Sequence, residues 1–195
     1  MDNEIKKLIE KAISESITDF QRKPFDYLLS EREAQSLVFD KLRKVFSEPK
    51  YESSIYINNP TFEYKGPIAS VRLELPIDDG KWKPDIVILT KDPQLTYQTK
   101  YEFADIKSAI QAIIEIKVAW GIDSVILRGL QEDINKVKNI SAISGGYALL
   151  FWGNEYSLFN EEQAKWIQTF LQKELHKLGD HNVRIIFRDM VFPST

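Results

Sequence analysis

The chain has 195 residues, of which 43% are hydrophobic and 12% aromatic, and this suits one globular domain with a sizeable core. It contains no cysteine, which excludes disulfides and cysteine-ligated zinc and fits a reducing compartment, so we expect a cytoplasmic protein. The formal net charge of −3 argues mildly against a dedicated nucleic-acid binder, because Lys and Arg supply most non-specific affinity for phosphates. It does not exclude an enzyme that acts on nucleic acid, because basic side chains can gather on one face while carboxylates collect at a metal site.

The beginning of the chain predicts two helices separated by a break at residues 23–24. Residues 3–19 carry charges throughout and apolar residues at helical spacing, the pattern of an amphipathic helix rather than of a signal peptide. The second helix is expected over residues 31–46, and Ser30 and Glu33 have the spacing of a capping box. No apolar run approaches the length that spans a membrane.

The rest of the chain predicts a sheet with helices on both faces. Strands such as 86–89 and 147–152 are apolar on both faces, which indicates helices covering each side. A helix separates the strand around Glu115 from the strand at 147–152, so these two strands should pair in parallel. The expected elements are extended segments at 51–57 and 70–76, a turn at 78–80, strands at 83–89 and 112–118 joined by a connection that is irregular over 100–111, a helix at 128–139, a break at 145–146, a strand at 147–152, a helix at 161–178 and a strand at 183–188.

Two of the strand-like segments, 83–89 and 112–118, set acidic side chains into otherwise apolar runs. Buried carboxylates need a partner, and a divalent cation is one. Alternation along the second segment places Glu115 and Lys117 on one face, with Ile114, Ile116 and Val118 on the other. If Asp85 lies on a neighbouring strand, three ionisable groups converge.

These residues resemble the motif of the PD-(D/E)XK nuclease superfamily, with Pro84-Asp85 on one strand and Glu115-Ile116-Lys117 on the next. Pro84-Asp85 is the only Pro-Asp pair in the chain. An acidic residue two positions before a lysine occurs six times, but only Glu115 stands inside an apolar, mostly β-branched run long enough for a buried strand. The context of the motif therefore selects these two segments.

The resemblance implies the restriction-endonuclease-like fold, whose core has the order αβββαβ. The predicted helix, three strands, helix and strand follow that order over about residues 28–152. Residues 1–22 would add an N-terminal helix, and residues 160–195 a C-terminal helix and strand. We therefore predict one α/β domain over residues 1–195, with a central mixed β-sheet flanked by helices.

The resemblance also implies a Mg²⁺-dependent nuclease that hydrolyses phosphodiester bonds, with DNA as the expected substrate and endonucleolytic cleavage favoured. Asp85, Glu115 and the carbonyl of Ile116 would bind Mg²⁺, with Mn²⁺ as a substitute. Lys117 would orient or activate the attacking water and stabilise the transition state. A homodimer is expected on the same grounds, because paired active sites are common among enzymes that cut both strands.

Members of this superfamily often contribute one further acidic residue from the first core helix. Glu31 falls in line with the apolar stripe that should face the sheet, whereas Glu33 lies nearly opposite and has the capping role, so Glu31 is the expected fourth catalytic residue and Gln35 its candidate neighbour. The alternative interpretation of Glu31 is that an acid in the first turn simply favours the positive end of the helix dipole. Glu74 is a candidate accessory residue, unless it pairs with Arg72 on the same strand face.

Basic residues on or near the helix at 128–139 are candidate nucleic-acid contacts by the same resemblance, although a solvated helix face is the favoured interpretation. They are Arg128, Lys136 and Lys138. Three tryptophans offer aromatic surfaces for stacking bases, but core packing is the favoured prediction for each. They are Trp120, Trp152 and Trp166.

Two non-enzymatic interpretations remain open. In the first, a nuclease-fold protein without turnover binds nucleic acid or a protein partner; in the second, the acidic strand residues form a structural ion-pair network with Lys117. Other chemistries have little support. No Gly-rich phosphate loop is present, so no nucleotide cofactor is expected, and neither His176 nor His181 belongs to a convincing triad.

Overall fold

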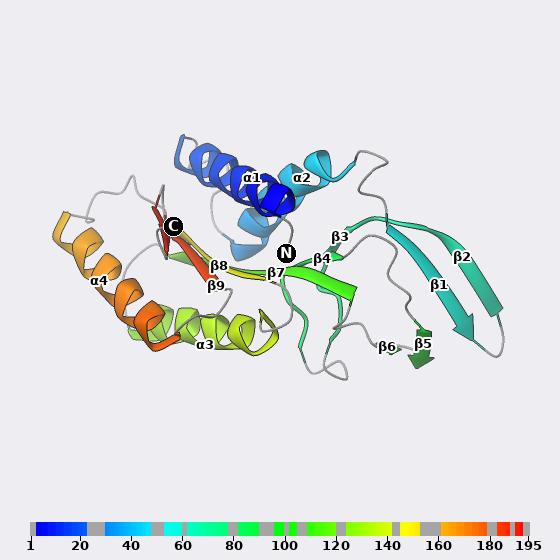
Figure 1. Cartoon of the computed structure of the whole chain (residues 1–195). Helices are drawn as coiled ribbons and strands as arrows, with labels where there is room; N and C mark the ends of the chain where they lie inside the picture. Colours follow the sequence, from blue (N-terminus) through cyan, green and yellow to red (C-terminus); the bar gives the residue numbers. More distant parts are fainter. Residues whose placement is uncertain are drawn as a thin grey trace.

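A mixed β-sheet lies between helices in the computed structural model, which gives the chain an α/β fold (Figure 1). The structure describes residues 3–22, 30–47, 53–59, 62–77, 82–89, 96–99, 102–104, 109–119, 124–141, 145–152, 161–178, 183–187 and 190–192. The helices in these ranges are α1 (Asn3–Arg22), α2 (Glu31–Val45), α3 (Ser124–Ser141) and α4 (Glu161–Leu178). The strands are β1 (Ser53–Asn59), β2 (Phe62–Ile68), β3 (Val71–Leu73), β4 (Ile86–Leu89), β5 (Thr96–Thr99), β6 (Glu102–Ala104), β7 (Ile110–Ala119), β8 (Gly146–Trp152), β9 (Val183–Phe187) and β10 (Met190–Phe192).

The main sheet has the strand order β10-β9-β8-β7-β4-β3. β7, β8 and β9 run parallel to one another, whereas β3, β4 and β10 pair antiparallel with their neighbours. The parallel pairing of the Glu115 strand with the following strand is therefore confirmed. β1 and β2 form a separate antiparallel hairpin that projects away from the sheet beside β3 (Figure 1).

The helices cover both faces of this sheet, as the apolar strands predicted. α1 and α2 lie over one face, while α3 and α4 lie on the other (Figure 1). α3 packs against β7, β8 and β9, and α4 packs against β9 and β10. None of the described helices is long and apolar enough to cross a membrane.

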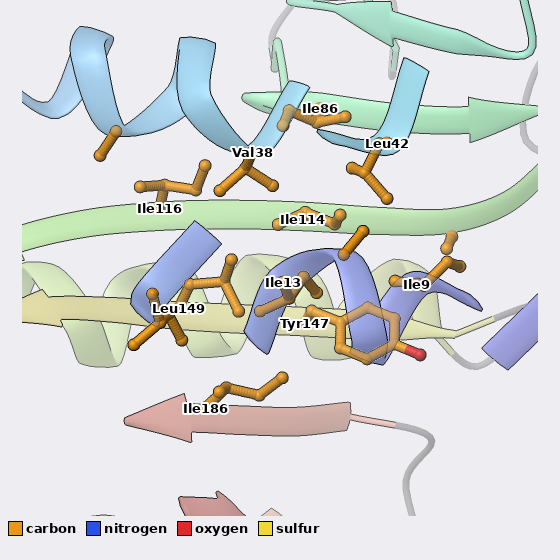
Figure 2. Packing of buried hydrophobic residues seen from close by; sticks show 14 of the residues in the cluster. Ile9, Ile13, Val38, Leu42, Ile86, Ile114, Ile116, Tyr147, Leu149 and Ile186 are labelled. Carbon is orange, nitrogen blue, oxygen red and sulfur yellow. The ribbon is translucent and has the colours of Figure 1, made fainter. Parts of the chain in front are cut away.

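An apolar cluster fills the space between the sheet and the α1–α2 pair (Figure 2). Alternate residues of β7 enter this cluster, because successive side chains of a strand point to opposite faces. Ile114 and Ile116 are buried in it and Val118 packs against it. Glu115 and Lys117 therefore lie on the opposite, α3-covered face, which confirms the predicted alternation.

The N-terminus of α2 is fixed by a capping box, as its sequence predicted. The Glu33 amide donates to the Ser30 hydroxyl, and the Ser30 amide donates to the Glu33 carboxylate. Both bonds satisfy amides that a helix start leaves without intrahelical partners. The cap fixes the first turn of α2, which carries Glu31. The short capping sequence therefore helps to position this candidate site residue.

Several elements differ from the prediction. β2, β5, β6 and β10 were not expected; β2 contains Gly66 and Pro67, which depress strand propensity. β6 and the start of β7 occupy part of the connection predicted to be irregular. β4 starts at Ile86, so Asp85 precedes the strand instead of lying within it. The break predicted at 23–24 and the turn predicted at 78–80 lie outside the described residues.

Core packing was the wrong prediction for Trp166. Trp166 lies on α4 and is 49% exposed, and its ring stacks on that of Phe170 with 6.4 Å between ring centroids. Contact with a neighbour on the same helix leaves about half of the residue accessible to solvent. Trp120 and the side chain of Trp152 lie outside what the structure describes.

Replacing Ser30 by Ala should lower the free energy of unfolding by about 1 kcal/mol, because the hydroxyl that accepts from the Glu33 amide is lost. Chemical denaturation followed by circular dichroism measures this change. Ser36→Ala is the matched control within α2, since the Ser36 hydroxyl bonds only back to the Arg32 carbonyl one turn earlier. Equal destabilisation by both variants would contradict the capping role.

Candidate active site

Asp85 joins β4 to β7 beyond the point where their main chains pair. The described pairing of these strands begins with Ile86 opposite Ile114. Two residues beyond Ile114 along β7, the amide of Ile116 donates to Asp85 Oδ2 at 2.7 Å. The Asp85 carboxylate thus takes the place of a main-chain carbonyl in the ladder and is held beside the Glu115–Lys117 segment.

The main chain of Asp85 is fixed as well. Gln35 Nε2 donates to the Asp85 carbonyl at 3.0 Å and approaches Oδ1 at 3.4 Å. The Glu74 amide donates to the same carbonyl at 3.3 Å. Glu74 has φ 45°, a left-handed conformation that is uncommon for a non-glycine residue.

Glu115 is 6% exposed and points to the same region from β7. Its Oε1 accepts a hydrogen bond from the Trp82 indole N–H at 2.8 Å. Trp82 is itself positioned by main-chain bonds with Ile77 on the approach to β4. The sequence analysis missed this contact, although a partly buried tryptophan near polar residues normally needs a partner for its N–H.

Lys117 is held by two carboxylates from two different helices. Its ammonium donates to Glu31 Oε2 of α2 at 3.0 Å and lies 3.4 Å from Asp133 Oδ2 of α3. Asp133 Oδ1 in turn accepts from Lys136 at 2.9 Å. The described part of the site therefore combines four carboxylates with two ammonium groups.

Asp133 was missed by the sequence analysis, although a signal for it exists. Leu130, Ile134 and Val137 are the buried stripe of α3, and Asp133 falls within this stripe and is only 6% exposed. An acid on the apolar side of an amphipathic helix is seldom buried without a partner. Its position in the helical pattern therefore marks it as part of a polar site.

Burial raises the pKa of both strand carboxylates. Removal from water, with the nearby charges of Glu31 and Asp133, raises the pKa of Asp85 to about 6, against the opposing effect of the Ile116 hydrogen bond and the Lys117 charge. Burial and the charges of Asp85 and Asp133 raise the pKa of Glu115 to about 8, against the Trp82 hydrogen bond and the Lys136 charge. Each carboxylate lacks enough positive charge nearby to offset its desolvation.

The lysines show the opposite balance. Burial lowers the pKa of Lys117, but its hydrogen bond to Glu31 and the charge of Asp133 outweigh this and raise the pKa above the ordinary value. For Lys136, burial is likewise outweighed by the hydrogen bond to Asp133, and its pKa is raised. Both side chains therefore remain ammonium ions at neutral pH.

Most of the residues proposed from the sequence lie together. Asp85, Glu115, Lys117, Glu31 and Gln35 are linked by the contacts above. These residues come from α2, from β7 and from the residue that precedes β4. Glu31 keeps 46% of its side chain exposed, so it reaches Lys117 from the rim of the site and not from the buried stripe of α2.

The remaining candidates are placed differently. The expectation that Glu74 projects from a strand is wrong, because β3 ends at Leu73 and Glu74 lies in an exposed bend that offers its amide to Asp85. Lys136 pairs with Asp133, Arg128 is exposed on α3, and Lys138 is half-buried there.

The donor set fits a hard cation that needs few protein ligands. Among the described residues, no three His, Cys, Asp or Glu side chains converge as a group that could hold a metal ion. Mg²⁺, however, is usually bound through one or two carboxylates and keeps several waters. Asp85 and Glu115 are two such carboxylates, and their raised pKa values indicate that additional positive charge would stabilise them.

Comparisons with protein-family models, with curated proteins and with solved structures each found no match. The argument for function therefore rests on the geometry of these residues.

Glu115→Gln should change how the stability of the protein depends on pH. Because the folded-state pKa of Glu115 is raised from 4.5 to about 8, wild-type stability should be full below the lower value and fall as pH rises through the higher one. Glutamine cannot ionise, so in EDTA-containing buffer near pH 8.5 the variant should exceed wild type by on the order of 3 kcal/mol. At about pH 5 the two should differ much less.

Thermal unfolding monitored across this pH range measures the effect. Glu132→Gln, an exposed change on α3, is the matched control and should leave the pH profile of wild type unaltered. A wild-type stability that rises from pH 5 to 8.5 in EDTA would contradict the buried, uncompensated state of Glu115.

Proposed function

We propose that this protein is a Mg²⁺-dependent nuclease of the PD-(D/E)XK superfamily that hydrolyses phosphodiester bonds in DNA, with endonucleolytic cleavage favoured. The observation that carries the proposal is the convergence of Glu115 and Lys117 of β7 with Asp85, which directly precedes β4. A buried and a half-buried carboxylate beside a lysine are costly to fold because each charge loses hydration, and such arrangements are common at active sites.

The order of elements supports the same proposal. α2, β3, β4, β7, α3 and β8 follow the chain as helix, three strands, helix and strand, with the β1–β2 hairpin inserted before β3 and the short β5–β6 pair inserted before β7. Strands β3, β4, β7 and β8 are also consecutive neighbours in the sheet. This is the arrangement that we expect for a restriction-endonuclease-like αβββαβ core.

Asp85, Glu115 and the Ile116 carbonyl are the residues that would hold Mg²⁺, or Mn²⁺ in its place. When bound, the cation would supply Lewis-acid polarisation of the phosphate and neutralise charge that develops on its oxygens. The protein prepares these ligands: Trp82 fixes the orientation of Glu115, and the Ile116 amide and Gln35 fix Asp85. The network thus lowers the reorganisation needed at the site.

Lys117 acts as a hydrogen-bond donor in this proposal. Its pKa is raised above that of an ordinary lysine, so it remains charged at neutral pH and is poorly suited to removing a proton. A charged ammonium instead orients the attacking water or a phosphate oxygen and stabilises negative charge in the transition state. Glu31 and Asp133 keep the ammonium in place beside the carboxylates.

The proposed DNA contacts lie on α3. Lys136 is 46% exposed while its ammonium pairs with Asp133, so it can approach a backbone phosphate from the rim of the site. Arg128 and Lys138 belong to the same helix, but residues two apart do not share a helix face, so Arg128 is the one that extends this basic surface. A homodimer would place two such sites on the two strands of a duplex.

A non-catalytic nuclease-fold binding module is the second candidate, and a specific observation favours it. Every charged group of the site already has a protein partner: Asp85 accepts from Ile116, Glu115 from Trp82, and Lys117 pairs with two acids. Such an arrangement also satisfies a purely structural network. Metal binding and turnover distinguish the two candidates.

The purified protein should cleave supercoiled, linear or single-stranded DNA with Mg²⁺ or Mn²⁺, and EDTA should abolish the cleavage. Lys117→Ala should lower the rate by roughly a hundredfold or more, because charge stabilisation in the transition state is lost. Lys41→Ala is the matched control: Lys41 is 25% exposed, close to the 23% of Lys117, but pairs with Asp19 away from the site. Activity that persists in Lys117→Ala would show that another site or a contaminant cleaves the DNA.

Mg²⁺ should raise the melting temperature of the wild type more than that of Asp85→Asn or Glu115→Gln. A ligand that binds only the folded state at a hundred times its Kd adds about 2.7 kcal/mol of stability, and these variants each lose a proposed ligand charge. Thermal scans with Mg²⁺ and with EDTA give the increment for each variant, and Asp40→Asn, an exposed change on α2, should keep the full increment. Mg²⁺ stabilisation without cleavage of any DNA would favour the non-catalytic module.

A further inference from the structure

The buried aspartate of α3 has a role that the sequence motif does not include. We propose that Asp133 is a positioning residue that holds the Lys117 ammonium at the candidate site, and this rests on the proposed function of Lys117. Asp133 contacts neither proposed metal ligand directly; its two described partners are lysines. Its effect on chemistry would therefore pass through Lys117.

The two oxygens of Asp133 are divided between two cations. Oδ2 lies 3.4 Å from Lys117 Nζ, and Oδ1 lies 2.9 Å from Lys136 Nζ. Because Lys136 is only three residues further along α3, its bond turns the carboxylate within the helix and leaves Oδ2 facing β7. The pair of bonds fixes the direction from which Lys117 is held.

The stem of Lys117 runs past the same helix. A Cβ placed on Gly129 would lie 3.6 Å from Lys117 Cε, so the stem passes α3 on the side of Gly129. Gly129 and Asp133 are four residues apart and thus share one side of the helix. The stem therefore passes α3 beside a residue without a side chain, and the Asp133 carboxylate, one turn further on, holds the ammonium.

Glu31 and Asp133 hold Lys117 in different environments. Glu31 keeps 46% of its side chain exposed, whereas Asp133 is buried. Water screens an exposed ion pair, so the Glu31 contact can be exchanged for a substrate oxygen at small cost. The pairing with Asp133 is less screened and would persist when a phosphate enters.

The first test is the ¹⁵N–¹H signal of the Lys117 ammonium in EDTA-treated, lysine-labelled protein without DNA. The wild type should show a resonance in slow exchange with water, assigned by its loss in Lys117→Met. Asp133→Asn should broaden or remove it, Asp133→Glu should restore it in part, and Glu132→Gln should leave it unchanged. Glu132 is the exposed neighbour of Asp133 on α3, which makes it the matched control.

An unaltered Lys117 resonance in folded Asp133→Asn would overturn the proposal, as would the lack of a slowly exchanging Lys117 resonance in the wild type. Asp133→Asn removes the described partner of Lys136 and one of the two described partners of Lys117. If this variant does not fold, the double variant Asp133→Asn/Lys136→Gln takes its place, because it keeps the net charge of the wild type. Loss of the resonance in that folded double variant supports the proposal, and its retention overturns it.

Cleavage kinetics form the second test. Asp133→Asn should lower kcat at least tenfold and change KM by less than twofold. A misplaced ammonium reduces the stabilisation of the transition state more than it reduces the affinity for DNA. A rise in KM with unchanged kcat would overturn the positioning role. Absence of cleavage by the wild type would refute the nuclease, whereas the resonance experiment would still decide whether Asp133 positions Lys117.

Discussion

The hydrogen bond from the Ile116 amide to the Asp85 carboxylate is the constraint on which the site depends. At 2.7 Å, it continues the β4–β7 ladder by one bond after the main-chain pairing starts at Ile86. If β4 began earlier in the chain, a main-chain carbonyl would accept from the Ile116 amide. This hydrogen bond would then need no acidic side chain. Because a side chain replaces the carbonyl, a carboxylate is brought into the sheet between two helical layers. The bond to Glu115 from Trp82 and the ion pairs of Lys117 are arranged around that carboxylate.

The two faces of β7 divide stability from chemistry. Ile114 and Ile116 point into the apolar cluster beneath α1 and α2, where burial of aliphatic side chains favours folding. Glu115 and Lys117 point to the other face, where burial raises the pKa of Glu115 to about 8. Since strand alternation ties the two sets together, the packing of the isoleucines holds the charged residues in a position that they would not favour by themselves. The core thereby offsets the cost of the site.

Sequence patterns predicted the parts of this arrangement that depend on local order. The capping box of Ser30 and Glu33, the alternation around Glu115 and the parallel pairing with β8 all follow from short-range periodicity or from chain connectivity. The Trp82–Glu115 and Asp133–Lys117 contacts join residues that are far apart in the chain or lie on different elements. Their formation depends on how α3 and the segment before β4 pack on the sheet, which no local pattern specifies. Glu74 was misplaced for a related reason, because its left-handed φ ends the strand early.

The distribution of charge in the described site fits both a structural and a catalytic interpretation. Lys117 and Lys136 are each matched by Asp133, and Lys117 also by Glu31, so the positive charges are shared among acids on the helices. The described hydrogen bonds to the Asp85 and Glu115 carboxylates come from neutral N–H donors of Ile116, Gln35 and Trp82. Burial raises the pKa of both carboxyl groups, and these hydrogen bonds and the nearby lysines do not fully offset it. Here the acids of the helices hold the lysines, and no described lysine forms an ion pair with Asp85 or Glu115. This division of charge is the feature that the proposed cation-binding role of the two carboxylates would use.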